Sequence, residues 1–77
     1  MKTIVGKRYR HYKGGEYTVI AVGHREEDPS KLSVVYRSEY DDPEYPIGTV
    51  WIRPLESFEE VISVKGEEVS RFTLLSP

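Results

Sequence analysis

The chain has 77 residues, no cysteine, 38% hydrophobic and 31% charged residues, and a formal net charge of −2. This composition is typical of a globular protein and excludes disulfides, thiolate chemistry and a cysteine-based zinc site. No apolar run approaches the roughly 20 residues that a transmembrane helix needs. We therefore expect one small domain over residues 1–77, and the lack of cysteine and of an apolar leader favours a cytoplasmic location.

The charges are distributed unevenly along the chain. Residues 1–15 contain five lysines and arginines and no acid, whereas residues 16–77 contain six against thirteen acids. Pairing of the two parts across a sheet would account for this asymmetry. The chain also lacks asparagine and glutamine, which removes the bidentate amide contact by which many proteins read adenine in DNA.

The first half of the chain predicts three strands. Residues 8–12 form the first strand, and residues 13–15 (KGG) follow as a hairpin turn in which glycine supplies the positive φ angles. Residues 16–23 (EYTVIAVG) are apolar on both faces, which predicts a central, buried strand. Residues 24–30 are interpreted as a polar loop, and residues 32–37 (LSVVYR) as a third strand rich in β-branched side chains.

The second half begins with residues 39–48 (EYDDPEYPIG), the longest irregular segment. A fourth strand is predicted over residues 49–53, a single helical turn over 54–58, a hairpin over 60–71 that turns at Lys65-Gly66, and a last strand over 72–75. The expected fold class is mainly β: a small SH3-like barrel or a strongly curved antiparallel sheet of five to six strands with one short helical turn. An OB-like fold is the second choice.

Catalytic and metal-binding motifs are missing from the sequence. No serine lies in a Gly-x-Ser-x-Gly elbow, and there is no phosphate-binding Gly-rich motif or His-Glu-x-x-His sequence. The two histidines, His11 and His24, lack the spacing of a metal site. We interpret the chain as non-enzymatic, and we expect no cofactor and no metal.

Basic and aromatic residues alternate in the first strand. Strand geometry places Arg10 and Tyr12 on one face and Tyr9 and His11 on the other. Arginine grips phosphate or carboxylate through a planar fork, and aromatic rings offer a flat platform for a nucleobase. We expect the Arg10/Tyr12 face to meet the fourth strand in a ligand site whose candidate residues are Arg10, His11, Tyr12, Lys13, Tyr36, Trp51 and Arg53.

Four segments, residues 6–19 (GKRYRHYKGGEYTV), 34–37 (VVYR), 50–58 (VWIRPLESF) and 64–72 (VKGEEVSRF), carry a family resemblance. The chain resembles the bacterial domain-of-unknown-function family 1653, whose small proteins read Tyr-Arg-His-Tyr/Phe-Lys-Gly, then Val-Tyr, then Trp-Val-Arg-Pro. The resemblance implies a compact β domain and brings no activity with it. The positions that match its motifs are Tyr9, Arg10, His11, Tyr12, Lys13, Gly14, Tyr36, Trp51, Arg53 and Pro54. This chain departs from the family pattern at Arg25 and in a longer segment over residues 40–48.

Three functions are compatible with these features. The first is a small binding module for an anionic, ring-containing, nucleotide-like molecule, which it would carry or sequester without turnover. The second is an RNA- or single-stranded-DNA-binding barrel that uses residues 7–13 as a basic stripe. The third is an SH3-like module that binds a protein or peptide through Tyr40, Tyr45 and Trp51. A homodimer through an open sheet edge is compatible with all three.

Overall fold

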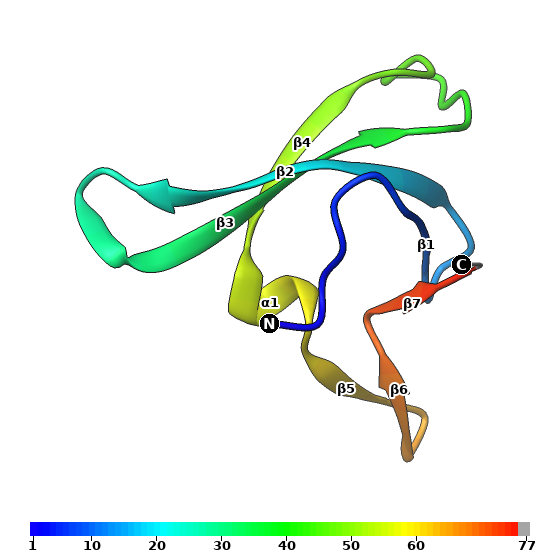
Figure 1. Cartoon of the computed structure of the whole chain (residues 1–77). Helices are drawn as coiled ribbons and strands as arrows, with labels where there is room; N and C mark the ends of the chain where they lie inside the picture. Colours follow the sequence, from blue (N-terminus) through cyan, green and yellow to red (C-terminus); the bar gives the residue numbers. More distant parts are fainter. Residues whose placement is uncertain (76–77) are drawn as a thin grey trace.

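The chain forms seven strands and one helical turn in the computed structural model, which describes residues 1–75 (Figure 1). The elements are β1 (Arg8–His11), β2 (Glu16–Arg25), β3 (Asp28–Ser38), β4 (Val50–Pro54), α1 (Leu55–Phe58), β5 (Val61–Val64), β6 (Glu67–Ser70) and β7 (Phe72–Leu74). The helix, of four residues, is too short and insufficiently apolar to span a membrane, and no other helix is present in residues 1–75.

Five strands form one antiparallel sheet in the order β4-β3-β2-β1-β7, and β5 and β6 pair as a separate hairpin. The predicted central position of β2 is confirmed, but burial of both its faces is not, because Val19 is completely buried whereas Ile20 is 40% exposed. The sheet curves around α1 but remains open, because its outermost strands, β4 and β7, are not paired with each other in the part of the chain that the structure describes (Figure 1). The mainly β, antiparallel fold is therefore confirmed, whereas a closed SH3-like or OB-like barrel is not.

The polar loop predicted over residues 24–30 is wrong. Strand β2 continues to Arg25 and β3 begins at Asp28, and these two residues pair across a turn at residues 26–27. His24 Nδ1 lies 2.8 Å from the Pro29 carbonyl oxygen, which ties the strands together near the hairpin end. This end projects beyond the core (Figure 1), so both of its faces meet solvent and polar side chains are compatible with strand.

Three other local predictions are confirmed. Strands β5 and β6 form a hairpin in which Lys65 and Gly66 have φ of 52° and 83°, the two positive angles that a type I′ turn requires. The helical turn follows Pro54, whose fixed φ of −54° suits the start of a helix. Residues 39–49 are irregular, as expected for the segment with two prolines.

The core lies on the concave side of the sheet and is mostly aromatic. Val19 and Val34 are completely buried in the middle strands, and Phe58 of α1 packs over them at 2% exposure. Phe58 stacks on Phe72 of β7 with ring centroids 4.0 Å apart and planes 9° apart. The convex side has no such cover, and Ile52 on β4 is 71% exposed.

Glu59, which follows α1, holds the N-terminal segment against this core. Its Oε2 accepts hydrogen bonds from the Lys2 and Thr3 backbone N–H groups at 2.7 and 2.8 Å, and from Thr3 Oγ1 at 2.8 Å. Burial opposes ionisation of Glu59, but these hydrogen bonds outweigh it and lower the pKa of the carboxyl. Residues 1–5 thereby cover one side of the core close to Tyr9, whose hydroxyl accepts from the Ile4 N–H.

Replacing Phe58 with alanine should destabilise the protein severely. The substitution removes the stacked partner of Phe72 and leaves a cavity, which typically costs about 3–5 kcal/mol. Because a domain of this size has only a few kcal/mol of stability, the variant should be largely unfolded. The check is urea denaturation followed by tryptophan fluorescence, with the exposed Ile52→Ala as the control, expected within about 0.5 kcal/mol of the original. Equal midpoints for the two variants would contradict this account of the core.

Candidate functional site

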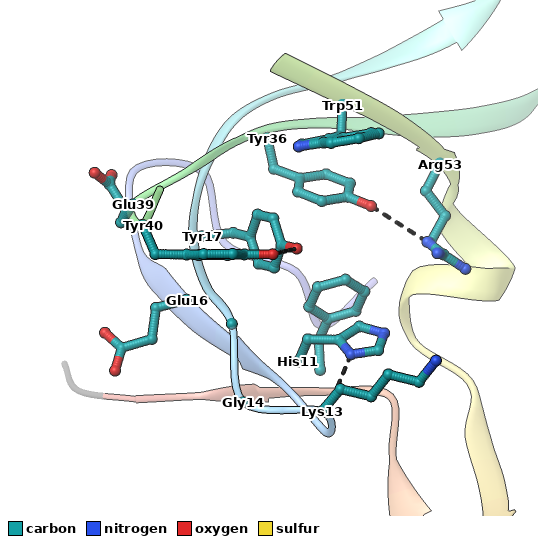
Figure 2. Close-up of a pocket in the computed structure, with 12 residues that line it drawn as sticks. His11, Lys13, Gly14, Glu16, Tyr17, Tyr36, Glu39, Tyr40, Trp51 and Arg53 are labelled. Atoms are coloured by element: carbon teal, nitrogen blue, oxygen red, sulfur yellow. Dashed lines mark hydrogen bonds between the residues drawn. The ribbon is translucent and has the colours of Figure 1, made fainter. Parts of the chain in front are cut away.

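A cavity of about 710 Å³ lies at the end of the aromatic core, where the β1–β2 turn faces β3 and β4 (Figure 2). Its volume is within the range of about 300–1,000 Å³ that is usual for small-molecule sites. The walls come from segments far apart in the sequence: the β1–β2 hairpin, the end of β3 and the irregular segment after it, β4 and β7. The lining residues are His11, Lys13, Gly14, Gly15, Glu16, Tyr17, Tyr36, Glu39, Tyr40, Trp51, Arg53 and Phe72.

The structure brings together five of the seven residues that the sequence predicts for a ligand site. These five are His11, Lys13, Tyr36, Trp51 and Arg53. Two residues on neighbouring strands, Tyr36 and Trp51, are register partners, so their side chains emerge side by side on the concave face. The geometric part of the prediction, a shared cavity for the motifs of β1, β3 and β4, is therefore correct for these five positions.

The prediction that the Arg10/Tyr12 face meets β4 is wrong. Tyr9 is buried in the core, so the Tyr9/His11 face of β1 is the concave one, and alternation turns Arg10 to the convex face. Arg10 is exposed there and pairs with Glu16 at 3.5 Å. Tyr12 lies beyond the end of β1, and its ring packs against His11 outside the cavity, with centroids 4.6 Å apart.

Several wall residues were not among the seven predicted for the ligand site, although Tyr40 was named for the peptide-binding alternative. Tyr17 is two residues before the buried Val19, so strand alternation would have placed it on the concave face. Tyr40 lies in the irregular segment, where no periodicity indicates a direction. The Tyr17 and Tyr40 hydroxyl oxygens are 2.7 Å apart, and burial together with this hydrogen bond raises the pKa of Tyr17.

His11 presents a hydrogen-bond donor to the cavity. The Lys13 backbone N–H donates to His11 Nδ1 at 3.2 Å, so the proton of the neutral ring is on Nε2. Burial, reinforced by the positive charges of Arg53, Arg71 and Lys13, lowers the pKa of His11 below its ordinary value of 6.5. The imidazole is thus neutral at physiological pH and points an N–H group toward Arg53 (Figure 2).

Arg53 is held by neutral partners. Its Nε donates to the Tyr36 hydroxyl at 3.3 Å, and its Nη1 donates to Ser57 Oγ at 2.9 Å. Within residues 1–75, Arg53 is the one arginine without a carboxylate at ion-pair distance, and its Nη2 has no hydrogen-bond partner there. Lys13, which extends toward the same side of the cavity, has no carboxylate partner in that part of the chain either (Figure 2).

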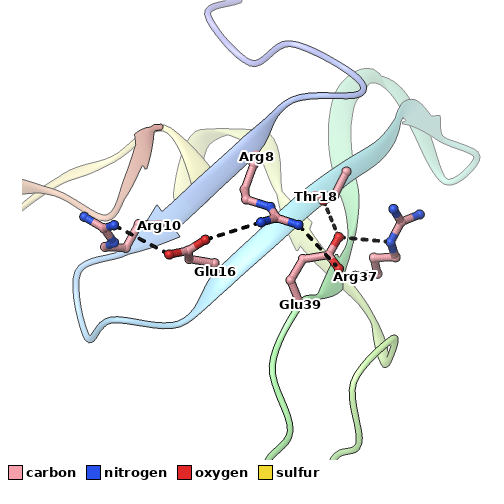
Figure 3. Close-up of polar contacts among 6 residues, drawn as sticks. All are labelled: Arg8, Arg10, Glu16, Thr18, Arg37 and Glu39. Atoms are coloured by element: carbon pink, nitrogen blue, oxygen red, sulfur yellow. Dashed lines mark hydrogen bonds and ion pairs between the residues drawn. The ribbon is translucent and has the colours of Figure 1, made fainter. Parts of the chain in front are cut away.

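The acidic residues at the cavity margin are neutralised from the convex face (Figure 3). Glu16 pairs with Arg8 at 3.7 Å as well as with Arg10, and Glu39 pairs with Arg37 at 3.2 Å and Arg8 at 3.9 Å. The Thr18 hydroxyl also donates to Glu39 and, with Arg37, lowers the pKa of that carboxyl. The interpretation that the basic and acidic parts of the chain pair across the sheet is confirmed for these residues.

Trp51 adds an unsatisfied donor to the wall. Its Nε1 is a buried side-chain nitrogen without any hydrogen-bond partner in residues 1–75. Leaving such a group unpaired costs about 1–3 kcal/mol. The indole ring meets Tyr45 in a T-shaped contact with centroids 4.9 Å apart. Residues 1–75 contain no group of three or more histidine, aspartate or glutamate side chains placed to hold a metal ion.

Replacing Arg53 with methionine should raise the pKa of His11. The substitution removes the positive charge that has the largest effect on the His11 pKa. Burial of the imidazole remains, so the pKa should stay below its ordinary value. NMR titration of the His11 ring signals measures the change, and Arg37→Met, which removes an arginine of the convex face, is the matched control. A His11 pKa that responds equally to both substitutions would contradict the assignment of Arg53 to the imidazole's surroundings.

The same pKa shift makes folding pH-dependent. The unfolded chain protonates His11 at a higher pH than the folded chain does, so the unfolded state binds more protons between the lowered pKa and 6.5. The His11 contribution should therefore reduce the free energy of unfolding as the pH falls from 6.5 through the folded-state pKa. Comparison of the original with His11→Phe by urea denaturation across this window isolates the effect; an unchanged pH profile would contradict it.

Comparisons with known proteins give one match. No curated protein and no solved structure matches the chain. A family model described as "Protein of unknown function (DUF1653)" matches residues 7–74, which include all seven strands and every lining residue of the cavity. The chain belongs to this family, as its sequence motifs indicated.

Proposed function

We propose that the protein is a binding module for a small anionic ligand with a planar ring, of the nucleotide class. The observation that carries the proposal is the set of donors that converge on one side of the cavity and have no acceptor of their own. His11 Nε2–H, Arg53 Nη2 and the Lys13 ammonium are all donors, and the Tyr36 hydroxyl, which already accepts from Arg53, has its proton left to give.

Such a donor set favours an anion with several acceptor oxygens. Lys13 and Arg53 contribute two positive charges, and His11 contributes a neutral N–H. Phosphate is complementary, because arginine and lysine bind its oxygens with charge-assisted hydrogen bonds. The carboxylates at the margin do not oppose it strongly, since Glu16 and Glu39 are paired with arginines of the convex face.

The orientation of His11 supports binding without turnover. A general base must present an unprotonated nitrogen to its substrate, but the unprotonated Nδ1 of His11 accepts from the Lys13 N–H instead. The nitrogen that faces the cavity carries the proton. Carrying or sequestering a signalling nucleotide would suit such a site, and we propose the cytoplasm as its compartment on the lack of cysteine.

The two alternatives are weaker. A nucleic-acid surface needs a continuous basic stripe, but Arg8 and Arg10 are paired with glutamates on the convex face while Lys13 turns into the cavity. An SH3-like peptide groove would need Tyr45 and Trp51 free, whereas these two rings pack on each other. Neither alternative gives a role to the unpaired donors.

Removal of the Arg53 guanidinium should abolish most of the binding. Thermal-shift screening of nucleoside monophosphates, dinucleotides and cyclic nucleotides would identify a ligand, and calorimetry would then compare the original with Arg53→Met. Hydrogen bonds to a charged group contribute about 1.5–3 kcal/mol, so the affinity should fall by at least about tenfold. Lys31→Met, which removes an exposed positive charge that does not line the cavity, should bind normally.

Two results would overturn the proposal. One is the absence of any thermal shift with the whole nucleotide panel at millimolar concentration. The other is an equal loss of affinity in Arg53→Met and Lys31→Met, because that would assign the binding to general positive charge instead of to the cavity.

A further inference from the structure

Gly15 is the glycine at which a neighbouring side chain, Tyr40, leaves no room for a Cβ atom. A Cβ atom at Gly15 would lie 2.6 Å from Tyr40 Cε1 and 2.8 Å from Cζ, well inside van der Waals contact. Its backbone does not have a positive φ, so no turn geometry demands glycine there. Gly14, in contrast, has a φ of 110°, and a Cβ added to it would meet no atom within 4 Å. Gly15 therefore provides the surface against which the Tyr40 ring lies.

A second contact fixes the other end of Tyr40. Its hydroxyl and that of Tyr17 are 2.7 Å apart, and the two rings meet in a T-shaped arrangement with centroids 5.6 Å apart. Tyr17 is itself anchored in the core by edge contacts with Tyr36 and Phe72. Tyr40 is thus positioned by the β1–β2 hairpin, although it belongs to the irregular segment after β3.

Tyr40 also differs from the other aromatic residues of the cavity in what covers it. Tyr36 and Phe72 are 5% and 7% exposed and belong to the core, and Trp51 is packed against Tyr45. Tyr40 is 37% exposed while lining the cavity. It lies on the opposite side of the cavity from Arg53 and from the Lys13 ammonium (Figure 2).

We propose that Tyr40 is the specificity-determining residue of the cavity. The planar ring of the ligand stacks on the Tyr40 ring, and the phosphate of the ligand binds Arg53 and Lys13. Gly15 makes this wall possible by leaving room for the ring. The inference rests on the proposed function and goes beyond it, because it assigns the preference for a ring to one side chain that is separate from the anion-binding donors.

The experiment compares ligands that share a phosphate but differ in the ring. Calorimetry measures the affinities of adenosine 5′-monophosphate, guanosine 5′-monophosphate and ribose 5-phosphate for the original protein, Gly15→Ala and Tyr40→Leu. Gly23→Ala is the matched control, because Gly23 has no positive φ and no atom within 4 Å of its added Cβ. Thermal unfolding verifies that each variant is folded, and Tyr40→Leu, which alters an exposed side chain, serves if Gly15→Ala is unstable.

The original protein should bind the nucleotides more tightly than ribose 5-phosphate by about five-fold to 150-fold, as one stacked base provides. Gly15→Ala and Tyr40→Leu should lose this preference while their affinity for ribose 5-phosphate changes less than about twofold, and Gly23→Ala should keep it. Retention of the preference in Tyr40→Leu, or equal binding of all three probes by the original, would overturn the inference and leave the anion site standing. Failure of all three probes to bind would overturn the inference, and the proposed function would fall with it if the rest of the nucleotide panel also gives no thermal shift.

Discussion

The stack of Phe58 on Phe72 is the contact on which the rest of the structure depends. It joins the helical turn after β4 to the edge strand β7, and so holds the sheet in its curve around α1. Tyr9 and Tyr36 pack edge-on against Phe58, and His11 packs edge-on against Phe72 with centroids 4.9 Å apart. The cavity is consequently the open end of the aromatic core, and its walls have the rigidity of packed rings.

The sheet also separates the charges of the molecule by face. Convex arginines, whose side chains are about half exposed, are matched by Glu16 and Glu39 at the sheet margin, and pairs open to solvent on one side contribute only about 0–1 kcal/mol each. Their more important effect is electrostatic: they leave the concave arginine without a competing carboxylate. A net charge of −2 thus coexists with a locally positive cavity, and that local excess adds to burial in lowering the pKa of His11. Overall charge was a poor guide to this site because pairing is local.

Local sequence patterns predicted most of the strands and turns, but they did not predict which face of a strand is buried. β-branched runs, Pro54 and the Lys65-Gly66 turn act over a few residues, so β2, α1 and the last hairpin were found from the sequence. Alternation also divided β1 correctly into two faces, but it does not say which face is inside. Burial of Tyr9 determines which face of β1 is inside, because its ring fills the core and its hydroxyl accepts a hydrogen bond from the Ile4 N–H. A guanidinium at the Tyr9 position would lose its hydration there without a partner.

Gly14 and Gly15 illustrate why the rest of the cavity could not be predicted from the sequence. The two glycines are adjacent and look equivalent in a hairpin turn, and positive φ angles were expected of them as turn residues. Only Gly14 has one; Gly15 is constrained by the ring of Tyr40, which lies beyond two further strands in the chain. The other contacts that build the cavity have the same long range: Tyr17 with Tyr40, and Tyr36 with Arg53. The ring wall and the donor set therefore exist only after β1–β2, β3 and β4 have assembled, and any ligand that contacts both will stabilise that assembly over the unfolded chain.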